Sequence, residues 1–267
     1  MPDIMPSART TTPVSFEGAV TEMLEFFKGN EWFVRSYWPE NRPRIERTFR
    51  DLQETVPPGR VFEPGCGNGY VSFLAARLGY EVTACDSWFP PDREELFALG
   101  GVRSFPANLN HLAPWPQLAD ASFDAVLFGE VFEHILNHPI GLLREVRRLL
   151  KPGGVMILTT PNPATLANAI RVLRGSHSLW GTDDFAASPK IADGSIIDNG
   201  EIHYREYRQD ELFKFLKAAD FDVVKASYVT TGSAQGEPLF KRILKSIPPI
   251  REHRLFGTGN YILARAR

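Results

Sequence analysis

From about residue 60 onward, short apolar runs alternate with segments of helical periodicity, and this alternation constrains the fold more than any other feature. The apolar runs predict buried strands, and the segments between them predict connecting helices. Such a rhythm is typical of a mostly parallel, twisted sheet with helices on both faces. The expected strands are 61–62, 82–85, 102–105, 123–128 and 155–159, and the expected helices are 70–78, 92–99 and 139–150.

The rest of the chain is predicted to complete one domain. Two helices are expected before the sheet, over 16–28 and over 43–55, with Pro43 at the start of the second. A further helix over 209–218 and strands over 221–230 and 260–264 follow a long irregular stretch, 161–202, whose length is typical of a lid or binding insert. The expected division is a flexible tail (1–15), cap helices (16–59), a cofactor-binding core (60–160), a cap insert (161–202) and a C-terminal part of the sheet (203–267).

Composition excludes several classes of protein. The 267 residues carry a formal charge of −2, which gives no field that would attract nucleic-acid phosphates. The chain has only two cysteines, so we expect no disulfide framework and a reducing, cytoplasmic compartment. Neither a signal sequence nor an apolar stretch long enough to span a membrane is evident. These features predict neither a nucleic-acid partner nor a membrane span, and they do not indicate an oligomeric state.

A glycine loop follows the first strand of this rhythm. Glu63 ends the strand, glycines follow at 65, 67 and 69 with Cys66 among them, and a helix begins at Tyr70. Glycines there let the backbone approach a ligand closely, and the helix N-terminus favours its anionic part. A dinucleotide fingerprint would need a third glycine at the position of Tyr70. Glycines that merely tighten a turn are the structural alternative.

Two acidic residues indicate what the loop binds. The carboxylate of Glu63 suits a ligand with an ammonium group and would repel a pyrophosphate, which makes a dinucleotide the second choice. Asp86 ends the next strand, 23 residues later, where folds of this kind hold a ribose through its hydroxyls. Ser87 and Trp88, which follow Asp86, could flank an adenine.

These motifs, with 107–109, 122–134, 142–154 and 203–207 in the same order, resemble the class I S-adenosylmethionine-dependent methyltransferases, in particular the branch that includes the ubiquinone-biosynthesis O-methyltransferases. The resemblance implies a Rossmann-like α/β fold, doubly wound, with a mostly parallel seven-stranded sheet whose last strand is antiparallel and inserted. It also implies S-adenosylmethionine as cofactor and S-adenosylhomocysteine as product. By resemblance, Asn108 and Leu109 lie near the adenine, and Glu130 lies beside the methionine end. The expected cofactor-binding residues are Glu63, Gly65, Cys66, Gly67, Gly69, Asp86, Ser87, Trp88, Asn108, Leu109 and Glu130.

Methyl transfer from a sulfonium is a direct displacement, so positioning and exclusion of water can supply much of the catalysis. If the acceptor is a hydroxyl or an ammonium group, a proton must leave, and a neutral histidine is a suitable base. His203 and His134 are the candidates, although His134 could equally hold a turn beside Glu133. No cluster of acids and histidines has ligand spacing in the sequence, so no metal is expected.

Aromatic residues gather in the segments expected to form the cap. The candidates for an acceptor pocket are Trp32, Tyr37, Trp38, Trp180, Tyr204 and Tyr207. A basic segment, 241–254, could bind an acidic substrate but is more typical of a solvated face. We therefore expect a methyltransferase that acts on a small molecule, most simply at a hydroxyl. An N- or C-methyltransferase, a nicotinamide-dependent oxidoreductase and a non-catalytic binding protein are the alternatives.

Overall fold

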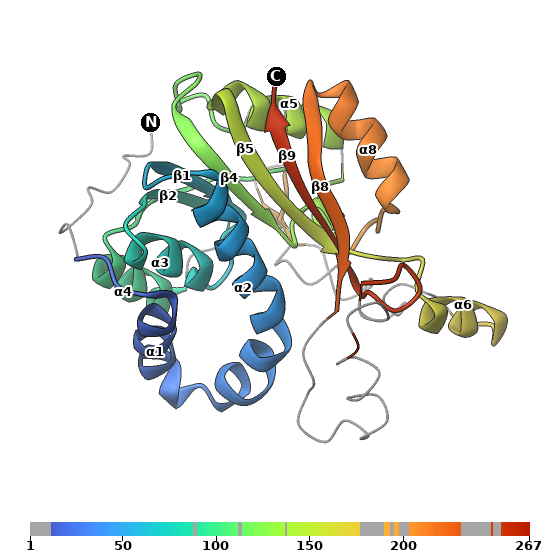
Figure 1. Cartoon of the computed structure of the whole chain (residues 1–267), viewed down its shortest axis with the longest axis horizontal. Helices are drawn as coiled ribbons and strands as arrows, with labels where there is room; N and C mark the ends of the chain where they lie inside the picture. Colours follow the sequence, from blue (N-terminus) through green and yellow to red (C-terminus); the bar gives the residue numbers. More distant parts are fainter. Residues whose placement is uncertain are drawn as a thin grey trace.

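A seven-stranded sheet runs through the middle of the molecule (Figure 1). The structure, a computed structural model, describes residues 12–87, 90–111, 114–136, 138–176, 190–192, 195–197, 203–230, 247 and 252–267. The strands of the sheet are β1 (Arg60–Pro64), β2 (Glu81–Asp86), β3 (Arg103–Pro106), β4 (Phe123–Gly129), β5 (Leu150–Pro161), β8 (Phe221–Val229) and β9 (Gly259–Ala266). Two short strands, β6 (Lys190–Ala192) and β7 (Ser195–Ile197), pair separately.

The strand order is β3-β2-β1-β4-β5-β9-β8. The pairs from β3 to β5 are parallel, whereas β9 is antiparallel to both of its neighbours, β5 and β8. The predicted Rossmann-like sheet, with its last strand antiparallel and inserted, is therefore confirmed. The chain leaves β1 toward β2 and β3 and then returns to the other side of β1 as β4. In such sheets, ligands bind outside the carboxyl ends of the strands at this point of reversal.

Helices cover both faces of the sheet (Figure 1). Alternate strand residues enter two separate cores: Val61 and Leu127 pack on one face, and Phe62 and Phe128 on the other. The first core is covered by α1 (Phe16–Phe26), α2 (Trp38–Thr55), α3 (Tyr70–Arg77) and α4 (Pro91–Gly100). The second is covered by α5 (Pro139–Leu149) and α8 (Gln209–Ala218). Among the described helices, none has the length and apolarity needed to cross a lipid bilayer.

Side chains cap several of these helices at the expected places. The backbone N–H of Gly18 donates to Ser15 Oγ (3.2 Å) at the start of α1. The N–H of Gly141 donates to His138 Nδ1 (2.7 Å) at the start of α5, so His138 caps that helix. Each cap satisfies a backbone donor that the helix itself leaves unpaired.

The predicted start of the second helix is wrong. A π-helical segment, Phe33–Tyr37, runs directly into α2, so the aromatic stretch is helical and Pro43 lies inside the helix. A proline inside a helix removes one backbone donor and crowds the carbonyl four residues earlier, at a cost of about 3 kcal/mol, which the packing of the rest of the helix must offset. Here α2 buries Ile45, Phe49 and Leu52 against the sheet. Because π segments concentrate at functional sites, the irregularity marks the part of the chain that faces the cavity described below.

Helix α6 (Leu166–Leu173) lies away from the sheet (Figure 1). It has no buried residue, and its last residue, Leu173, is 86% exposed. The chain that leads into α6 is fixed to the segment before β9, because Asn162 N–H donates to Thr258 O (2.8 Å) and Leu166 N–H to Leu255 O (2.9 Å). Residues 177–189, 193–194 and 198–202 of the predicted cap insert lie outside the described residues, so its role as a lid stays a prediction.

Candidate active site

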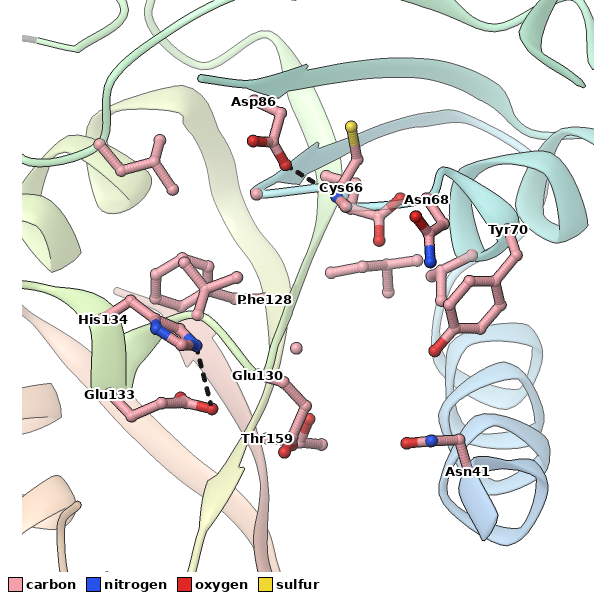
Figure 2. A pocket seen from close by; sticks show the side chains of 18 of the residues that line it. Asn41, Cys66, Asn68, Tyr70, Asp86, Phe128, Glu130, Glu133, His134 and Thr159 are labelled. Carbon is pink, nitrogen blue, oxygen red and sulfur yellow. Dashed lines mark hydrogen bonds and ion pairs between the residues drawn. The ribbon is translucent and has the colours of Figure 1, made fainter. Parts of the chain in front are cut away.

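A cavity of about 460 Å³ opens at the carboxyl ends of β1, β2 and β4, where the strand order reverses (Figure 2). The glycine loop and Asp86 line one end, which we call the ribose end. Glu133, His134 and His203 line the other end, which we call the acceptor end. Residues of the π segment and α2 form the wall between them. The sequence-predicted residues that line the cavity are Glu63, Gly65, Cys66, Gly67, Asp86, Ser87, Asn108, Leu109, Glu130, His134, His203 and Tyr37.

The glycine loop takes a backbone shape that requires glycine. Gly65, Gly67 and Gly69 have φ of 71°, 51° and 79°, in the left-handed region that other residues rarely adopt. A Cβ on Gly67 would meet no atom within 4 Å, so the loop faces open space there. The N–H of Gly67 donates to Asp86 Oδ2 (2.7 Å). The loop and the acid expected to bind one ligand are therefore already joined.

Gly69 faces α4 rather than the cavity. A Cβ on Gly69 would come within 2.5 Å of Phe97 Cε1 and 2.8 Å of Arg93 Cγ, both on α4. It does not line the cavity, and its missing side chain makes room for α4 instead. Of the three glycines predicted to bind cofactor, this one has a packing reason that the sequence pattern did not reveal.

Glu63 is nearly fully buried beneath the loop and accepts a hydrogen bond from Ser72 Oγ. Burial, with a further contribution from Asp86, raises the pKa of Glu63 to about 8 against the opposing effect of the Ser72 bond. Burial likewise raises the pKa of Cys66 well above its ordinary value, which fits a structural thiol rather than a nucleophile.

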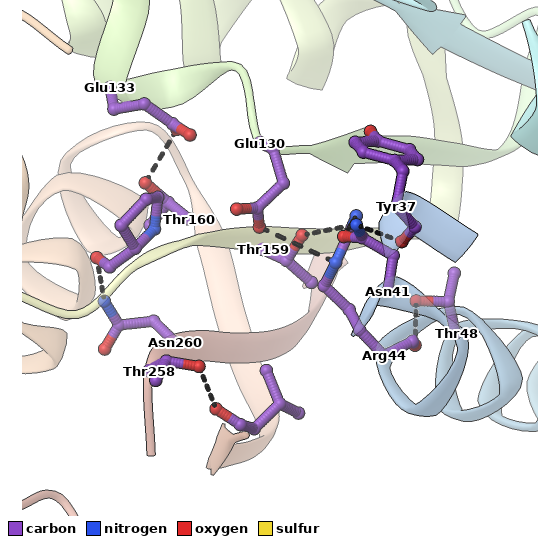
Figure 3. Close-up of polar contacts among 12 residues, drawn as sticks. Tyr37, Asn41, Arg44, Thr48, Glu130, Glu133, Thr159, Thr160, Thr258 and Asn260 are labelled. Carbon is purple, nitrogen blue, oxygen red and sulfur yellow. Dashed lines mark hydrogen bonds and ion pairs between the residues drawn. The ribbon is translucent and has the colours of Figure 1, made fainter. Parts of the chain in front are cut away.

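Arg44, on α2, is a cavity residue that the sequence analysis missed (Figure 3). Its Nη1 donates to Thr159 Oγ1 (3.2 Å), its Nη2 donates to Asn41 Oδ1 (2.8 Å), and its Nε lies 3.9 Å from Glu130 Oε1. Burial disfavours its charge, but Glu130 and two neighbouring tyrosines hold the pKa of Arg44 above its ordinary value. The only sequence signal was its place one residue after Pro43, which was taken for a helix start.

Glu130 is held in an unusual backbone conformation at the end of β4, with φ of 55°. Strained backbone of this kind clusters at functional sites. Its Oε1 is buried and accepts no hydrogen bond from the residues that the structure describes. An acceptor left unpaired in this way is costly unless a ligand supplies the donor.

Three titratable side chains converge at the acceptor end, and Figure 2 shows two of them, Glu133 and His134. Glu133 Oε1 lies 3.9 Å from His134 Nε2 and 3.9 Å from His203 Nε2, and the two imidazole rings are 5.0 Å apart in a T-shaped arrangement. Glu133 is 1% exposed, and its Oε2 accepts from Thr160 Oγ1 (2.9 Å; Figure 3). Burial, together with Glu130, raises the pKa of Glu133 to about 7.

The same three groups could hold a divalent cation, because their ligand atoms all lie within 4.8 Å of one another. Spacing along the sequence does not reveal this cluster. Glu133 and His134 are adjacent, but His203 joins them only through the fold, 69 residues further along the chain. The expectation that no metal is used stays a prediction.

The aromatic candidates are scattered. Tyr37 lines the cavity, and Trp32, which is 59% exposed, packs against it with ring centroids 5.0 Å apart. Trp38 and Tyr207 are buried in the two cores, and Tyr204, although partly buried, does not line the cavity. Trp88, Trp180 and most of the basic segment 241–254 lie outside the described residues.

Comparison with known proteins agrees with this geometry. Residues 62–158 match the family model described as "Methyltransferase domain". The chain is 30% identical over 176 residues to a ubiquinone biosynthesis O-methyltransferase of Xanthomonas campestris pv. campestris (strain B100), covering 64% of this chain and 66% of that protein. A second one, from Xanthomonas axonopodis pv. citri (strain 306), is 30% identical over 192 residues, covering 70% of this chain and 72% of that protein.

Solved structures share the fold. A 1,6-didemethyltoxoflavin-N1-methyltransferase of Burkholderia thailandensis, solved with 1,6-didemethyltoxoflavin and S-adenosylhomocysteine, superposes with a TM-score of 0.54 at 19% identity, covering 99% of this chain and 95% of that one. A methyltransferase from Archaeoglobus fulgidus has the same TM-score at 18% identity, covering 84% and 93%. Together with the sequence relatives, they show that this chain belongs to the S-adenosylmethionine-dependent methyltransferase family.

Proposed function

We propose that the protein transfers a methyl group from S-adenosylmethionine to a hydroxyl group of a small molecule. The observation that carries this proposal is the single cavity that joins the ribose end to the acceptor end. The ribose end offers a carboxylate and glycine backbone suited to a nucleoside, and the acceptor end offers histidines that can take up a proton. The names of the curated relatives support an oxygen acceptor.

The residues of the ribose end and the wall fit the cofactor. Asp86 would hold the ribose hydroxyls, and the open face of Gly67 leaves room for the nucleoside to approach the backbone. The unpaired Glu130 Oε1 would accept a hydrogen bond from the amino group of the methionine part, and Arg44 would hold its carboxylate. Bound in this way, S-adenosylmethionine supplies an electrophilic methyl group on a sulfonium.

His203 is the better placed base for the acceptor. Its Nδ1 lies 3.1 Å from Glu206 Oε1, so a proton on Nδ1 is held by that carboxylate and Nε2 can take up another. As the acceptor oxygen formed its bond to the methyl carbon, the methyl–sulfur bond would break to leave S-adenosylhomocysteine, and the proton of the hydroxyl would pass to His203 Nε2. Glu206 and Glu133 would stabilise the imidazolium that results. Because its pKa is about 7, Glu133 is partly ionised at neutral pH, and its carboxylate would balance the positive charge of the imidazolium.

The alternatives differ in what they require of the cavity. A nicotinamide dinucleotide would place its pyrophosphate at the glycine loop, beside Glu63 and Asp86, and would need a glycine where buried Tyr70 stands. A nitrogen or carbon acceptor would use the same cofactor site, so only the identity of the product separates it from an oxygen acceptor. A non-catalytic protein would have no use for His203 between two carboxylates.

The test begins with isothermal titration of the full chain with S-adenosylhomocysteine and with NADH. We expect binding of S-adenosylhomocysteine alone, and binding of NADH alone would overturn the proposal. Methyl transfer from labelled S-adenosylmethionine is then measured against phenols, amines and activated carbon acids. Methylation of amines or carbon acids only would overturn the oxygen acceptor. Activity that is lost in EDTA and restored by Mg²⁺ would assign the three acceptor-end groups to a cation rather than to a base.

A further inference from the structure

A second buried arginine, Arg93, lies behind the glycine loop. It belongs to α4, its side chain is 0% exposed, and it does not line the cavity. Its Nη1 donates to Gly67 O (2.5 Å) and lies 3.5 Å from Cys66 Sγ and 3.7 Å from Asp86 Oδ2. These partners all belong to the ribose end of the cavity.

The packing of α4 does not by itself call for a cation at this position. A buried charge is costly unless it is paired and hydrogen-bonded, and an apolar side chain of similar size commonly stabilises a fold as well or better. Phe97, on the same helix, packs beneath Gly69 and shows that an apolar contact with the loop is available. The guanidinium of Arg93 is therefore better explained by what it does to the loop than by the stability of the fold.

Asp86 and Arg93 hold the two peptide groups that flank the Cα of Gly67. The N–H of Gly67 donates to Asp86 Oδ2 (2.7 Å), and its carbonyl oxygen accepts from Arg93 Nη1. A Cβ added to Gly67 would meet no atom within 4 Å, and glycine is the residue with the most backbone freedom. Cys66, the residue before it, is fixed by backbone bonds to Cys85 (3.1 Å) and Gly69 (2.8 Å), so the bonds from Asp86 and Arg93 are the ones that orient the N–H and the carbonyl of Gly67 itself.

Arg93 also balances charge. Glu63 on β1 and Asp86 on β2 face the same end of the cavity, and the charge of Asp86 raises the cost of ionising Glu63. Cys66, the other titratable group beside them, is a neutral thiol. Among the described residues at this end, Arg93 is the cation that lies close to the acids.

We infer that Arg93 is a positioning residue for the cofactor, which holds the Gly67 peptide and the Asp86 carboxylate in the arrangement that receives the ribose hydroxyls. The inference rests on the proposed use of S-adenosylmethionine. It gives α4 a part in the site although no atom of α4 reaches the cavity. It also explains Gly69, because a side chain there would displace Arg93 Cγ and Phe97.

The test compares Arg93→Met with Arg77→Met. Arg77 is a matched control, because its side chain is also largely buried and makes a two-point bond to Glu22 (2.6 and 2.9 Å), far from the cavity. We expect Arg93→Met to weaken binding of S-adenosylhomocysteine about tenfold to hundredfold, since it removes charge-assisted contacts that order the site. Arg77→Met should bind as the wild type does. Thermal unfolding of both variants shows whether each is folded.

A second measurement separates positioning from a general loss of structure. Adenosine and 2′,3′-dideoxyadenosine differ only in the two ribose hydroxyls, so the ratio of their dissociation constants reports on Asp86. The wild type should prefer adenosine, and Arg93→Met should lose most of that preference. If Arg93→Met does not fold, Arg93→Lys carries the test, because a lysine keeps the charge without the planar fork. We expect it to weaken S-adenosylhomocysteine several-fold.

These measurements distinguish a failure of the proposed function from a failure of the role of Arg93. Wild-type protein that does not bind S-adenosylhomocysteine would overturn the proposed function itself. Wild-type protein that binds it, together with a folded Arg93 variant of equal affinity and equal preference for adenosine, would overturn only the role of Arg93.

Discussion

The two ends of the cavity are built in different ways. The ribose end comes from one continuous β-loop-α-β unit between Glu63 and Asp86. The acceptor end and the wall beside it bring together side chains from α2, from the turn after β4, from β5 and from the segment before α8. One end is thus set by local geometry and the other by long-range packing, and this difference determines how each should respond to mutation and pH.

Removal of the proposed base should have the largest effect, and it should affect the acceptor end alone. His203→Ala should lower the rate of methyl transfer about a hundredfold to ten-thousandfold, the range that general-base catalysis contributes. Affinity for S-adenosylhomocysteine should change little, because His203 lies at the acceptor end. The measurement is turnover with the best acceptor found, across the pH range, beside a titration with S-adenosylhomocysteine. His134→Ala is the matched control, and full activity of His203→Ala at every pH would leave that residue a structural role.

Asp86→Ala tests the other end. It should weaken S-adenosylhomocysteine more than tenfold, because charge-assisted hydrogen bonds to two hydroxyls are lost. Asp86→Asn keeps the shape and one acceptor oxygen, so its loss should be smaller. Calorimetric titration of both variants gives the comparison. Unchanged affinity in a folded Asp86→Ala protein would contradict the assignment of the ribose.

The same difference decides what could be predicted from sequence. Glu63, Gly67 and Asp86 could be assigned because strand, loop and helix follow one another in the chain, so spacing alone fixes their geometry. Arg44 was missed because its role depends on α2 continuing through Pro43, a matter of tertiary packing that overrides local preference. Arg93 sits in a run of charged residues that reads as a solvated helix face, yet it is buried.

The pH dependence of ligand binding should also differ between the two ends of the cavity. Glu63 has a pKa of about 8 in the free protein, raised chiefly by burial, so it is largely protonated at pH 6. The ligand ammonium group, which we propose to bond to Glu130, would also favour the Glu63 carboxylate through its charge, and binding would therefore release a proton below pH 8. We expect affinity for S-adenosylhomocysteine to rise by up to about tenfold per pH unit toward pH 8 and then to level off.

Two variants and a second ligand locate the source of this pH dependence. Glu63→Gln should flatten it, whereas Glu133→Gln, which removes the acid at the acceptor end, should leave it in place. Adenosine has no ammonium group and should show no such slope with the wild type. The proton release itself is measured by titration in buffers of different ionisation enthalpy. If the pH dependence of affinity is lost in Glu133→Gln and kept in Glu63→Gln, the two ends are coupled and not independent.

The smallest expected effect concerns the bond that orients Glu133. Thr160→Val keeps the shape of the side chain but removes the hydroxyl that donates to Glu133 Oε2, and it should lower the free energy of unfolding by about 1 kcal/mol.

The Thr160→Val substitution should also raise the pKa of Glu133 further, because a bond that favours the carboxylate is lost while burial remains. Because Glu133 titrates alike in both unfolded proteins, the deficit should be largest well above pH 7, where the carboxylate is present, and should shrink as pH falls below 7 and Glu133 becomes protonated in both folded proteins. Denaturant unfolding at pH 5 and pH 8 measures this difference, and an equal loss at both values would show that Glu133 does not titrate in this range. A titration with S-adenosylhomocysteine should be unaffected, since Thr160 touches only the acceptor end.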